Sequence, residues 1–258
     1  MNRPDLSRRG LIATGAALGG LMASGCDRIS QAPSVVDFLS GAEGLTRRGQ
    51  RLLLAAQPLA REFQAKDISP TFKPNGSIHP GGEAYAAMLA SGFADWRLKV
   101  FGLVQHPLSL SLAQLEALRA RTQITRHDCV EGWSAIGQWT GVPLGAVLHA
   151  AGLAPNARYI VFRCADQLEA GARGSGFYYE SIDLFDAFHP QTILAYALNG
   201  RPLDVAHGAP LRLRVERQLG YKQAKYLIGV EAVDRLDGIE GGKGGFWEDR
   251  GYEWYAGI

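Results

Sequence analysis

The sequence contains little cysteine. Three cysteines occur in 258 residues, at Cys26, Cys129 and Cys164. None of them forms a Cys-x-x-Cys pair, and the chain contains no His-x-x-x-His or Cys-x-x-Cys-His segment. These absences exclude zinc ribbons, thioredoxin-like redox pairs and covalently attached c-type haem, because each of those sites needs one of the missing spacings.

An excess of one charge is also missing. Lys and Arg number 27 against 25 Asp and Glu, so the formal net charge is +2. No basic stripe with interleaved aromatic residues is present, and we therefore expect no nucleic-acid partner. The run Gly241-Gly242-Lys243-Gly244-Gly245 lacks the Lys-Ser/Thr pair of a phosphate-binding loop and opens no helical pattern, so it predicts no nucleotide site.

Long apolar runs are limited to one stretch, Leu11 to Gly25, which is too short and too rich in glycine to span a bilayer comfortably. It follows Ser7-Arg8-Arg9-Gly10-Leu11-Ile12, a twin-arginine pattern. Residues 1–26 are therefore predicted to be a twin-arginine signal, and the protein to be exported to the periplasm. Because this route carries folded proteins, it favours a cofactor that is inserted in the cytoplasm.

The signal ends in Ala23-Ser24-Gly25-Cys26, which resembles a lipobox except that Ala23 stands where Leu is commoner. Two outcomes stay open, namely lipidation of Cys26 and simple cleavage nearby. A lipidated terminus would anchor the protein to a membrane surface without spanning it.

Hydrophobic periodicity after the signal predicts many short strands, a few helices and long loops. This pattern favours an α+β fold with a mixed sheet or barrel-like core. We divide the chain into a signal (1–26), a tether with a short helix over 51–63 (27–64), and one main domain (65–258). Helices are expected over 84–91, 109–118 and 144–151, and strands over 96–103, 122–125, 159–164, 182–187, 194–198 and 211–215. The Gly- and aromatic-rich segment 241–258 is expected to be a loop that covers another part of the protein.

The most unusual stretch is Arg126-His127-Asp128-Cys129-Val130-Glu131-Gly132-Trp133-Ser134. Charged and aromatic residues surround Cys129, and the neighbouring Arg126 and His127 predict a lowered thiol pKa. Three interpretations of Cys129 follow from these residues alone: a nucleophile, a metal thiolate, and a disulfide with Cys164.

A wider pattern bears on this choice. The segment Cys129 to Ser134, followed by Trp139-Thr140-Gly141-Val142-Pro143-Leu144, resembles the cysteine motif of the sulfite oxidase family. It is most similar to the branch that contains the catalytic subunit of the periplasmic methionine sulfoxide reductase. Downstream, His207-Gly208-Ala209-Pro210-Leu211-Arg212 and Gly220-Tyr221-Lys222-Gln223-Ala224-Lys225 resemble the second cofactor motif of the family. The resemblance covers residues 65–235 in the same order and spacing.

The resemblance implies a sulfite oxidase-type molybdopterin-binding fold and one Mo-molybdopterin cofactor per chain, which catalyses two-electron oxo transfer. It makes Cys129 the metal ligand, consistent with the preference of such metals for soft sulfur donors. Arg212 and Lys225 are implied to grip the pterin phosphate, joined by backbone groups of Gln223 and Ala224.

The chain departs from the reductase branch at two cofactor-binding positions. His207 stands where that branch has Asn, and Cys164 stands where it has Thr. An upstream cofactor contact is expected at Asn75, whose Pro-Asn-Gly setting also suits an ordinary turn.

Two further residues are candidates for a catalytic role. Tyr178 occupies a position that resembles the active-site tyrosine of sulfite oxidases, although the adjacent Tyr179 allows a register shift of one. Glu131, two residues after the proposed ligand, is expected either to tune the metal environment or to hydrogen-bond its own loop.

Two features absent from the sequence, a haem-binding motif and a dimerisation domain, determine the partners that we expect. With no haem motif, electrons must be exchanged with a separate haem protein or cytochrome, and with no room for a dimerisation domain we expect a monomer. The substrate is expected to be a small sulfur compound or a methionine-sulfoxide-type group, and direction stays open. Two alternatives are a metal-free binding or structural lipoprotein that keeps the fold, and a cysteine-nucleophile enzyme.

Overall fold

A computed structural model describes residues 45, 48, 49, 58–169 and 175–258. The chain divides into two compact units, Met1–Gln57 and Pro58–Ile258, and the fold below is that of the second. The predicted twin-arginine signal and Cys26 lie outside the described residues. Within the described ranges, no helix is both long and apolar enough to cross a bilayer.

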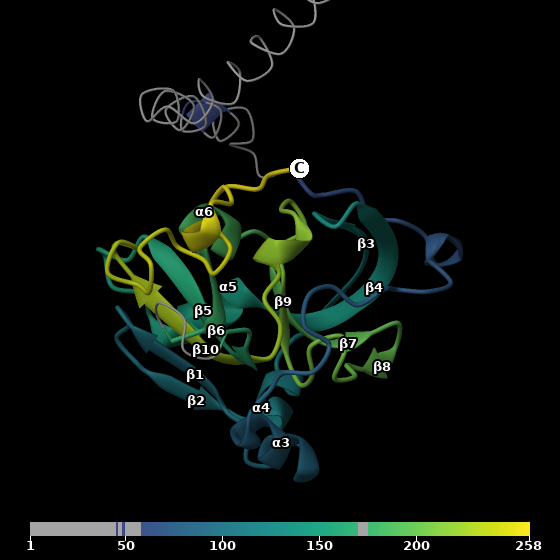
Figure 1. The fold of residues 1–258 in the computed structure, drawn as a ribbon, viewed down its shortest axis with the longest axis horizontal. Helices are drawn as coiled ribbons and strands as arrows, with labels where there is room; N and C mark the ends of the chain where they lie inside the picture. Colours follow the sequence, from purple (N-terminus) through teal and green to yellow (C-terminus); the bar gives the residue numbers. More distant parts are fainter. Residues whose placement is uncertain (1–44, 46–47, 50–57, 170–174) are drawn as a thin grey trace, which may run out of the picture. The chain divides into compact units, whose positions relative to one another are not determined.

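The first of two sheets is mixed. Its strand order is β2-β1-β10-β5-β6, with β1 and β10 parallel and the other neighbours antiparallel. This arrangement confirms the predicted mixed sheet in an α+β fold (Figure 1). The strands are β1 (Leu98–Gly102), β2 (Leu108–Leu110), β5 (Tyr159–Gln167), β6 (Phe177–Asp183) and β10 (Leu227–Val233).

The second sheet is antiparallel throughout. Its order is β3-β4-β7-β8, and β9 also pairs with β7. Its long β3–β4 hairpin curves across one side of the unit in Figure 1. The strands are β3 (Arg121–Cys129), β4 (Trp133–Pro143), β7 (Ile193–Leu198), β8 (Arg201–Pro202) and β9 (Arg212–Arg214).

Short helices connect the strands. The side chain of Ser111 accepts a hydrogen bond from the Gln114 N–H, which caps α4. Helix α5 ends at Gly152, whose φ of 67° is the left-handed conformation that glycine adopts without steric cost. The helices are η1 (Ala65–Asp67), α3 (Glu83–Ala90), α4 (Leu112–Glu116), α5 (Leu144–Ala151), α6 (Leu184–Ala187), η2 (Gly220–Lys222) and η3 (Glu248–Arg250).

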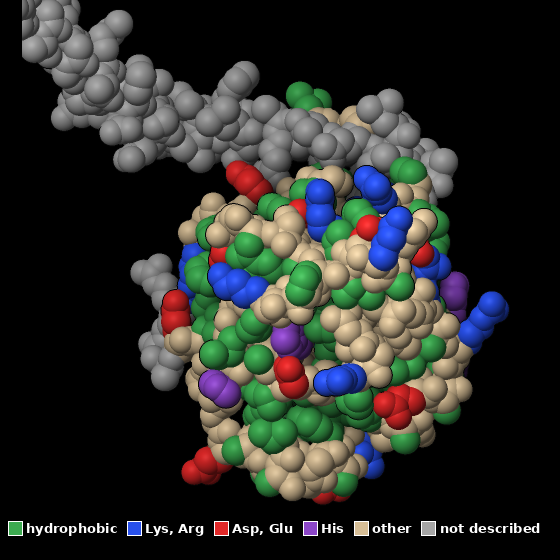
Figure 2. All heavy atoms as spheres, turned by 90° about the vertical axis from the view of Figure 1, so that its right-hand side faces the viewer, with side chains coloured by type: hydrophobic (Ala, Val, Ile, Leu, Met, Phe, Trp, Pro, Cys, Tyr) green, Lys and Arg blue, Asp and Glu red, His purple; other side chains and the backbone are tan. Residues whose placement is uncertain are grey.

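Both sheets contribute to one hydrophobic core. Leu98 and Ile160 of the first sheet and Leu194 and Leu213 of the second are fully buried members of the same cluster. Outside this core, Figure 2 shows a face on which acidic and basic side chains are interspersed with apolar ones. That face carries no broad basic patch, in keeping with the balanced charge of the sequence.

Several predicted elements differ from the structure. The strand predicted over 122–125 continues to Cys129, and β4 was not predicted. The strand predicted over 182–187 is instead the end of β6 followed by α6. Of the short helix predicted over 51–63, only residues 58–63 are described; they are not helical, and Glu62 forms a β-bridge with Thr125.

Strand β4 is hard to recognise because a motif glycine interrupts its side-chain pattern. A Cβ at Gly141 would lie 2.2 Å from the carbonyl oxygen of Leu194 on the neighbouring strand β7. The pairing of β4 with β7 is also irregular at Thr140/Gly141. This close approach of two backbones explains the glycine in the Trp139-Thr140-Gly141 motif.

Candidate active site

Cys129 is the last residue of β3 and points inward. Burial alternates along the strand, so that Gln123, Thr125, His127 and Cys129 share the buried face. Cys129 pairs with Trp133 across a tight turn in which the N–H of Gly132 donates to the Cys129 carbonyl, 3.0 Å away. Strand alternation and the turn therefore hold the thiol, 9% exposed, against the interior.

The Cys129 thiol borders a cavity of about 490 Å³, within the usual size range of a ligand site. Segments distant in the chain meet there because the two sheets and the C-terminal loop converge on it. The lining residues are Asn75, Gly76, Ser77, Cys129, Val130, Glu131, Asp166, Leu168, Glu169, Tyr178, Tyr221, Gln223, Lys225, Phe246, Trp247 and Tyr252.

Of the residues predicted from the sequence, six line this cavity and four do not. Arg212 lies directly behind it, as its contacts show below. Cys164 is 2% exposed within the hydrophobic core, and Ala224 is 1% exposed with its carbonyl bonded to the Leu213 N–H. The six that line the cavity are Asn75, Cys129, Glu131, Tyr178, Gln223 and Lys225.

His207 is the fourth residue that does not line the cavity. Its Nε2 bonds to the Phe72 carbonyl at 2.9 Å and its Nδ1 to Asp204 at 2.7 Å. The His207 carbonyl accepts a hydrogen bond from Arg212 Nη1 at 3.1 Å. His207 therefore orients Arg212 through its backbone, while its ring stabilises the neighbouring loop.

Arg212 is fully buried beside the cavity. Its Nη2 donates to Asn75 Oδ1 and to the Gln223 carbonyl, both at 3.3 Å, and its guanidinium lies over the Trp139 ring. Burial and then the neighbouring Arg214 lower the pKa of Arg212 to about 9. The Nε atom of Arg212 is buried without a hydrogen-bond partner among the described residues.

Lys225 is a second buried cation at the cavity. Its Nζ donates to the carbonyls of Ser77 and, at 2.8 Å, Ala206. Burial and then Arg212 lower the pKa of Lys225 to about 7. In the described part of the chain, neither Lys225 nor Arg212 forms an ion pair with a carboxylate. An anion bound at the cavity would therefore relieve the cost of burying these two charges.

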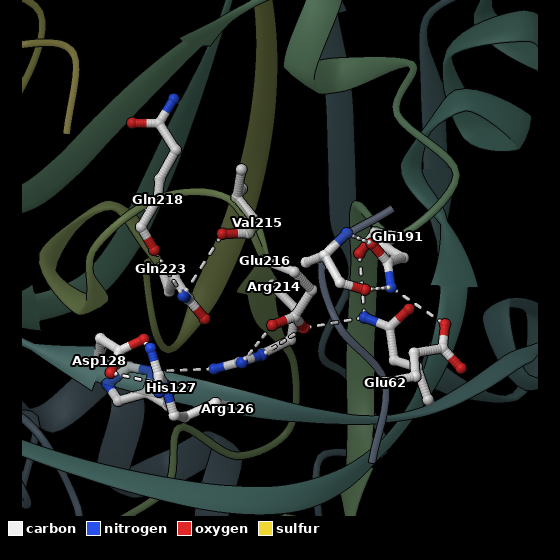
Figure 3. A network of polar contacts seen from close by, with 12 residues as sticks. Glu62, Arg126, His127, Asp128, Gln191, Arg214, Val215, Glu216, Gln218 and Gln223 are labelled. Atoms are coloured by element: carbon white, nitrogen blue, oxygen red, sulfur yellow. Dashed lines mark hydrogen bonds and ion pairs between the residues drawn. The ribbon is translucent and has the colours of Figure 1, made fainter. Parts of the chain in front are cut away.

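Arg214, which sequence reasoning did not single out, differs from Arg212 because its charge is neutralised. It holds Glu216 through two hydrogen bonds, at 3.0 Å and 2.6 Å. Its Nη1 lies 2.9 Å from Nδ1 of His127, and Figure 3 shows Arg214 reaching between Glu216 and His127. Because an arginine only donates, Nδ1 of His127 accepts, and burial lowers the pKa of His127 well below its usual value. His127 is therefore a neutral support behind Cys129.

The predicted lowering of the Cys129 pKa is wrong. Burial is the largest effect and raises the pKa of the thiol. Of the two expected activators, Arg126 is an exposed residue paired with Asp128 at 2.9 Å, and His127 is neutral. A free thiol in this setting keeps its proton and is a poor nucleophile, whereas a bound metal would compensate the thiolate charge.

Neither cysteine of the described unit forms a disulfide. Cys129 and Cys164 are both free and buried. Burial raises the pKa of Cys164 well above its usual value. The disulfide interpretation is therefore wrong for these two residues.

Adjacent tyrosines of β6 lie on opposite sides of the sheet. Tyr178 lines the cavity and its hydroxyl donates to the carbonyl of Tyr221. Tyr179 instead donates to Asp249 and does not line the cavity. Burial raises the pKa of Tyr178 well above its usual value, so its hydroxyl stays protonated. The structure thus places Tyr178, and not Tyr179, at the cavity, while its catalytic role stays a prediction.

Glu131 lies at the rim of the cavity, with its side chain 44% exposed. The indole N–H of Trp133 donates to it at 2.9 Å, and this hydrogen bond is the main reason that the pKa of Glu131 is lowered. Its other oxygen accepts a long hydrogen bond, 3.5 Å, from the Gly76 N–H. Glu131 is therefore an ionised carboxylate that ties the Cys129 turn to the upstream loop.

Asp166 is a cavity residue that sequence reasoning missed. It is 4% exposed, accepts a hydrogen bond from Ser77 Oγ at 2.8 Å, and has its second oxygen buried without a partner among the described residues. Burial raises the pKa of Asp166 to about 6. The upstream loop is hydrogen-bonded to several sides of the site. Asn75 bonds to Arg212 and Gly76 to Glu131. Ser77 bonds to both Asp166 and Lys225.

Comparison with known proteins identifies the family. A family profile described as an oxidoreductase molybdopterin binding domain matches residues 86–238. The chain belongs to this family. It is an oxidoreductase of the sulfite oxidase type, which confirms the fold and family inferred from the two motifs.

Named relatives refine the branch of this molybdopterin oxidoreductase. Over 97% of its length it is 35% identical to the "Putative protein-methionine-sulfoxide reductase subunit YedZ1" of Azospira oryzae, of which the match covers 88%. Over 55% of its length it is 40% identical to the protein-methionine-sulfoxide reductase catalytic subunit MsrP of Xanthomonas campestris, covering 46% of that protein. The chain thus spans about half the length of MsrP. The similarity to MsrP confirms the reductase-like branch.

Among solved structures, the chain is similar to the sulfane dehydrogenase SoxCD from Paracoccus pantotrophus. Sequence identity is 23%, the TM-score is 0.48, and the match covers 55% of this chain and 39% of the SoxCD chain.

The residues at the cavity fit the cofactor of this family. Cys129 places a sulfur donor at the cavity, the kind of ligand that soft metals prefer. The described residues contain no group of three or more His, Cys, Asp or Glu that could hold a metal. Arg212 and Lys225 are buried cations that have no carboxylate partner within the described ranges, and Nε of Arg212 has no hydrogen-bond partner there. Both features suit a bound phosphate. The backbone N–H of Gln223 already donates to the Gly220 carbonyl, so the prediction that it binds the phosphate lacks support.

Proposed function

We propose that this chain is an exported molybdenum-molybdopterin enzyme that reduces methionine sulfoxide in polypeptides. Cys129 would hold the metal, and Arg212 and Lys225 would hold the pterin phosphate. The bound cofactor supplies the two-electron oxo-transfer chemistry. A separate haem protein or cytochrome would deliver the electrons, because the sequence has no haem-binding motif.

The charge around the cavity is the observation that carries this proposal. Three carboxylates line it, those of Glu131, Asp166 and Glu169, and Lys225 is the one cationic side chain among the lining residues that the structure describes. Sulfite is an anion and would need unpaired cations at the site, whereas a sulfoxide is neutral. The cavity therefore supports a neutral substrate.

Other arginines that could have served an anionic substrate have partners of their own. Arg163 pairs with Glu231 at 2.6 Å, Arg217 with Asp186 at 2.7 Å, and Arg250 with Glu169 at 2.6 Å. Arg126 pairs with Asp128. Arg173 lies outside the described residues. These pairings leave Arg212 and Lys225 for the cofactor and add support for a neutral substrate.

The residues around the cavity have distinct tasks in this proposal. Tyr178 keeps its proton and donates to the Tyr221 carbonyl, which orients η2 next to the cofactor cations. Glu131 holds the turn that carries Cys129. The five aromatic lining residues exclude water from the part of the cavity that they line.

The substrate assignment predicts a preference that can be measured. Holoenzyme from a molybdenum-competent host is expected to oxidise reduced viologen dye with a methionine-sulfoxide peptide, forming one methionine per two electrons. With sulfite and an oxidising dye, kcat/KM is expected to be at least about 100-fold lower, because an uncompensated like charge costs several kcal/mol. A kcat/KM for sulfite equal to or above that for the peptide would refute the reductase assignment.

Export is part of the proposal and rests on residues 1–26. Replacing Arg8-Arg9 by Lys-Lys is expected to keep the protein in the cytoplasm, whereas the unchanged chain reaches the periplasm. In Cys26→Ser, loss of membrane association would show lipidation, and unchanged fractionation would show simple cleavage. Periplasmic delivery of the twin-lysine variant would contradict the route.

A further inference from the structure

The C-terminal segment builds one side of the cavity from aromatic rings. Phe246, Trp247 and Tyr252 line it, together with Tyr221 of η2, and we refer to these four residues as the aromatic wall. Trp247 and Tyr252 are stacked with ring centroids 5.4 Å apart, and Tyr221 meets Tyr252 edge-on at 5.2 Å. Phe246 meets Trp247 edge-on at 5.4 Å. Each ring of the wall is thus positioned by another ring.

Charged contacts hold the aromatic wall in place. Glu248, next to Trp247, bonds at 2.6 Å to Lys222, next to Tyr221. Arg250 covers the Phe246 ring at 3.6 Å from its centroid and pairs with Glu169, which follows β5. These contacts fix both ends of the segment that carries Trp247. The aromatic wall is therefore preorganised, so binding to it requires little ordering of the protein.

The aromatic wall is buried at its base and open at its edge. Phe246 is 3% exposed, Trp247 is partly buried, and Tyr252 is 40% exposed. The contact between Trp247 and Tyr252 therefore lies where the cavity meets solvent. A side chain that projects from a polypeptide could reach this pair while its backbone stays outside.

We propose that Trp247 and Tyr252 seat the sulfur and methyl end of a methionine sulfoxide side chain, an inference that rests on the proposed function. The sulfur of a sulfoxide carries partial positive charge and polarises its methyl group, and both are attracted to the electron-rich faces of aromatic rings. Trp247 and Tyr252 are stacked and both line the cavity, so a group bound beside one ring also lies near the other.

The same site disfavours the free amino acid. A free methionine sulfoxide carries an α-ammonium and an α-carboxylate. The carboxylates of Glu131, Asp166 and Glu169 can pair with the ammonium, but they repel the α-carboxylate. Lys225 is held by two backbone carbonyls and assigned to the cofactor. A residue within a peptide has no such charge. The open edge of the aromatic wall and the lack of a cationic partner for an α-carboxylate together favour a peptide-embedded substrate.

Two leucine variants, one conservative variant and one matched control test this binding position. In holoenzyme, Trp247→Leu and Tyr252→Leu are each expected to raise KM for a methionine-sulfoxide peptide about 5- to 30-fold, with a similar rise in Kd for the methionine-sulfone peptide, which binds without being reduced. Trp247→Phe, which keeps a ring, is expected to stay within about 3-fold. Phe177 is also 40% exposed but does not line the cavity, so Phe177→Leu is expected to match wild type.

The outcomes separate this inference from the proposed function. Molybdenum content equal to wild type shows that each variant is folded and loaded. If wild type reduces the peptide but both leucine variants keep the wild-type KM and Kd, Trp247 and Tyr252 do not bind the side chain, and the proposed function is unaffected. If wild type does not reduce the peptide, the proposed function fails. A free methionine sulfoxide KM equal to that of the peptide would overturn the peptide requirement alone.

Discussion

Cys129→Ser is expected to fold like wild type and to contain no stoichiometric molybdenum. Serine matches the shape of cysteine at this 9% exposed position, so the turn between β3 and β4 can persist. A serine hydroxyl, however, neither ionises near neutral pH nor offers the soft sulfur that such metals prefer. Since loss of an outer contact already costs about 10- to 100-fold in metal affinity, loss of the ligand is expected to cost at least about 100-fold.

Molybdenum and pterin per chain, measured on both proteins from the same host, check this expectation. Cys164→Ala is the matched control, because Cys164 is the other buried free cysteine and does not line the cavity. It is expected to load molybdenum normally. Full loading of Cys129→Ser would exclude Cys129 as the ligand, and loss of metal in Cys164→Ala would restore Cys164 as a cofactor contact.

Lys222→Met is expected to produce the largest loss of stability. Lys222 is fully buried and donates to both Glu180 and Glu248, which are themselves 0% and 1% exposed. Burial and then Glu248 raise the pKa of Glu180 well above its usual value, so Glu180 keeps its proton, and Lys222 forms its second ion pair with Glu248 at 2.6 Å. Removing the lysine leaves a buried carboxylate alone, which typically costs about 3–5 kcal/mol.

The control for this prediction is Glu180→Gln, which mimics the protonated carboxyl. Because the pKa of Glu180 is raised in the fold, its contribution is present below the unfolded value of 4.5 and declines as pH rises through its folded value. Glu180→Gln removes this decline, so its stability relative to wild type is expected to increase with pH. Urea unfolding of Lys222→Met and Glu180→Gln at pH 5 and pH 8 measures both effects. A Lys222→Met loss below about 1 kcal/mol would contradict the buried pair.

Local order along the chain was enough to recognise the family and the fold. The two motifs around Cys129 and Arg212 consist of residues that are close together along the chain. Each motif can therefore be recognised from its residue types and their spacing alone. Gly141 is one such requirement, since no side chain fits against the Leu194 carbonyl. Ser111 at the start of α4 and Gly152 after α5 were equally predictable because caps act within four residues.

The residues adjacent to Cys129 along the chain gave a wrong prediction of its pKa, because burial determines that pKa. Arg126 and His127 flank Cys129, yet alternation along β3 turns Arg126 to solvent and buries His127 against Arg214. The raised pKa of Cys129 follows from that burial and could not be read from adjacent residues. The contribution of Asp166 was missed for the same reason, since its partner Ser77 is 89 residues away.

The sequence by itself determined that Cys129 lies in a molybdopterin-binding fold, because a motif records contacts between residues that are close along the chain. Only the tertiary structure decided which cations are free for an anion, which tyrosine lines the cavity, and that Phe246, Trp247 and Tyr252 line the same cavity as Cys129. The physical reason is that charge pairing and burial depend on distances between residues far apart in the chain. Arg212 and Arg214 illustrate this, because two positions apart on β9 one is neutralised by Glu216 and the other is not.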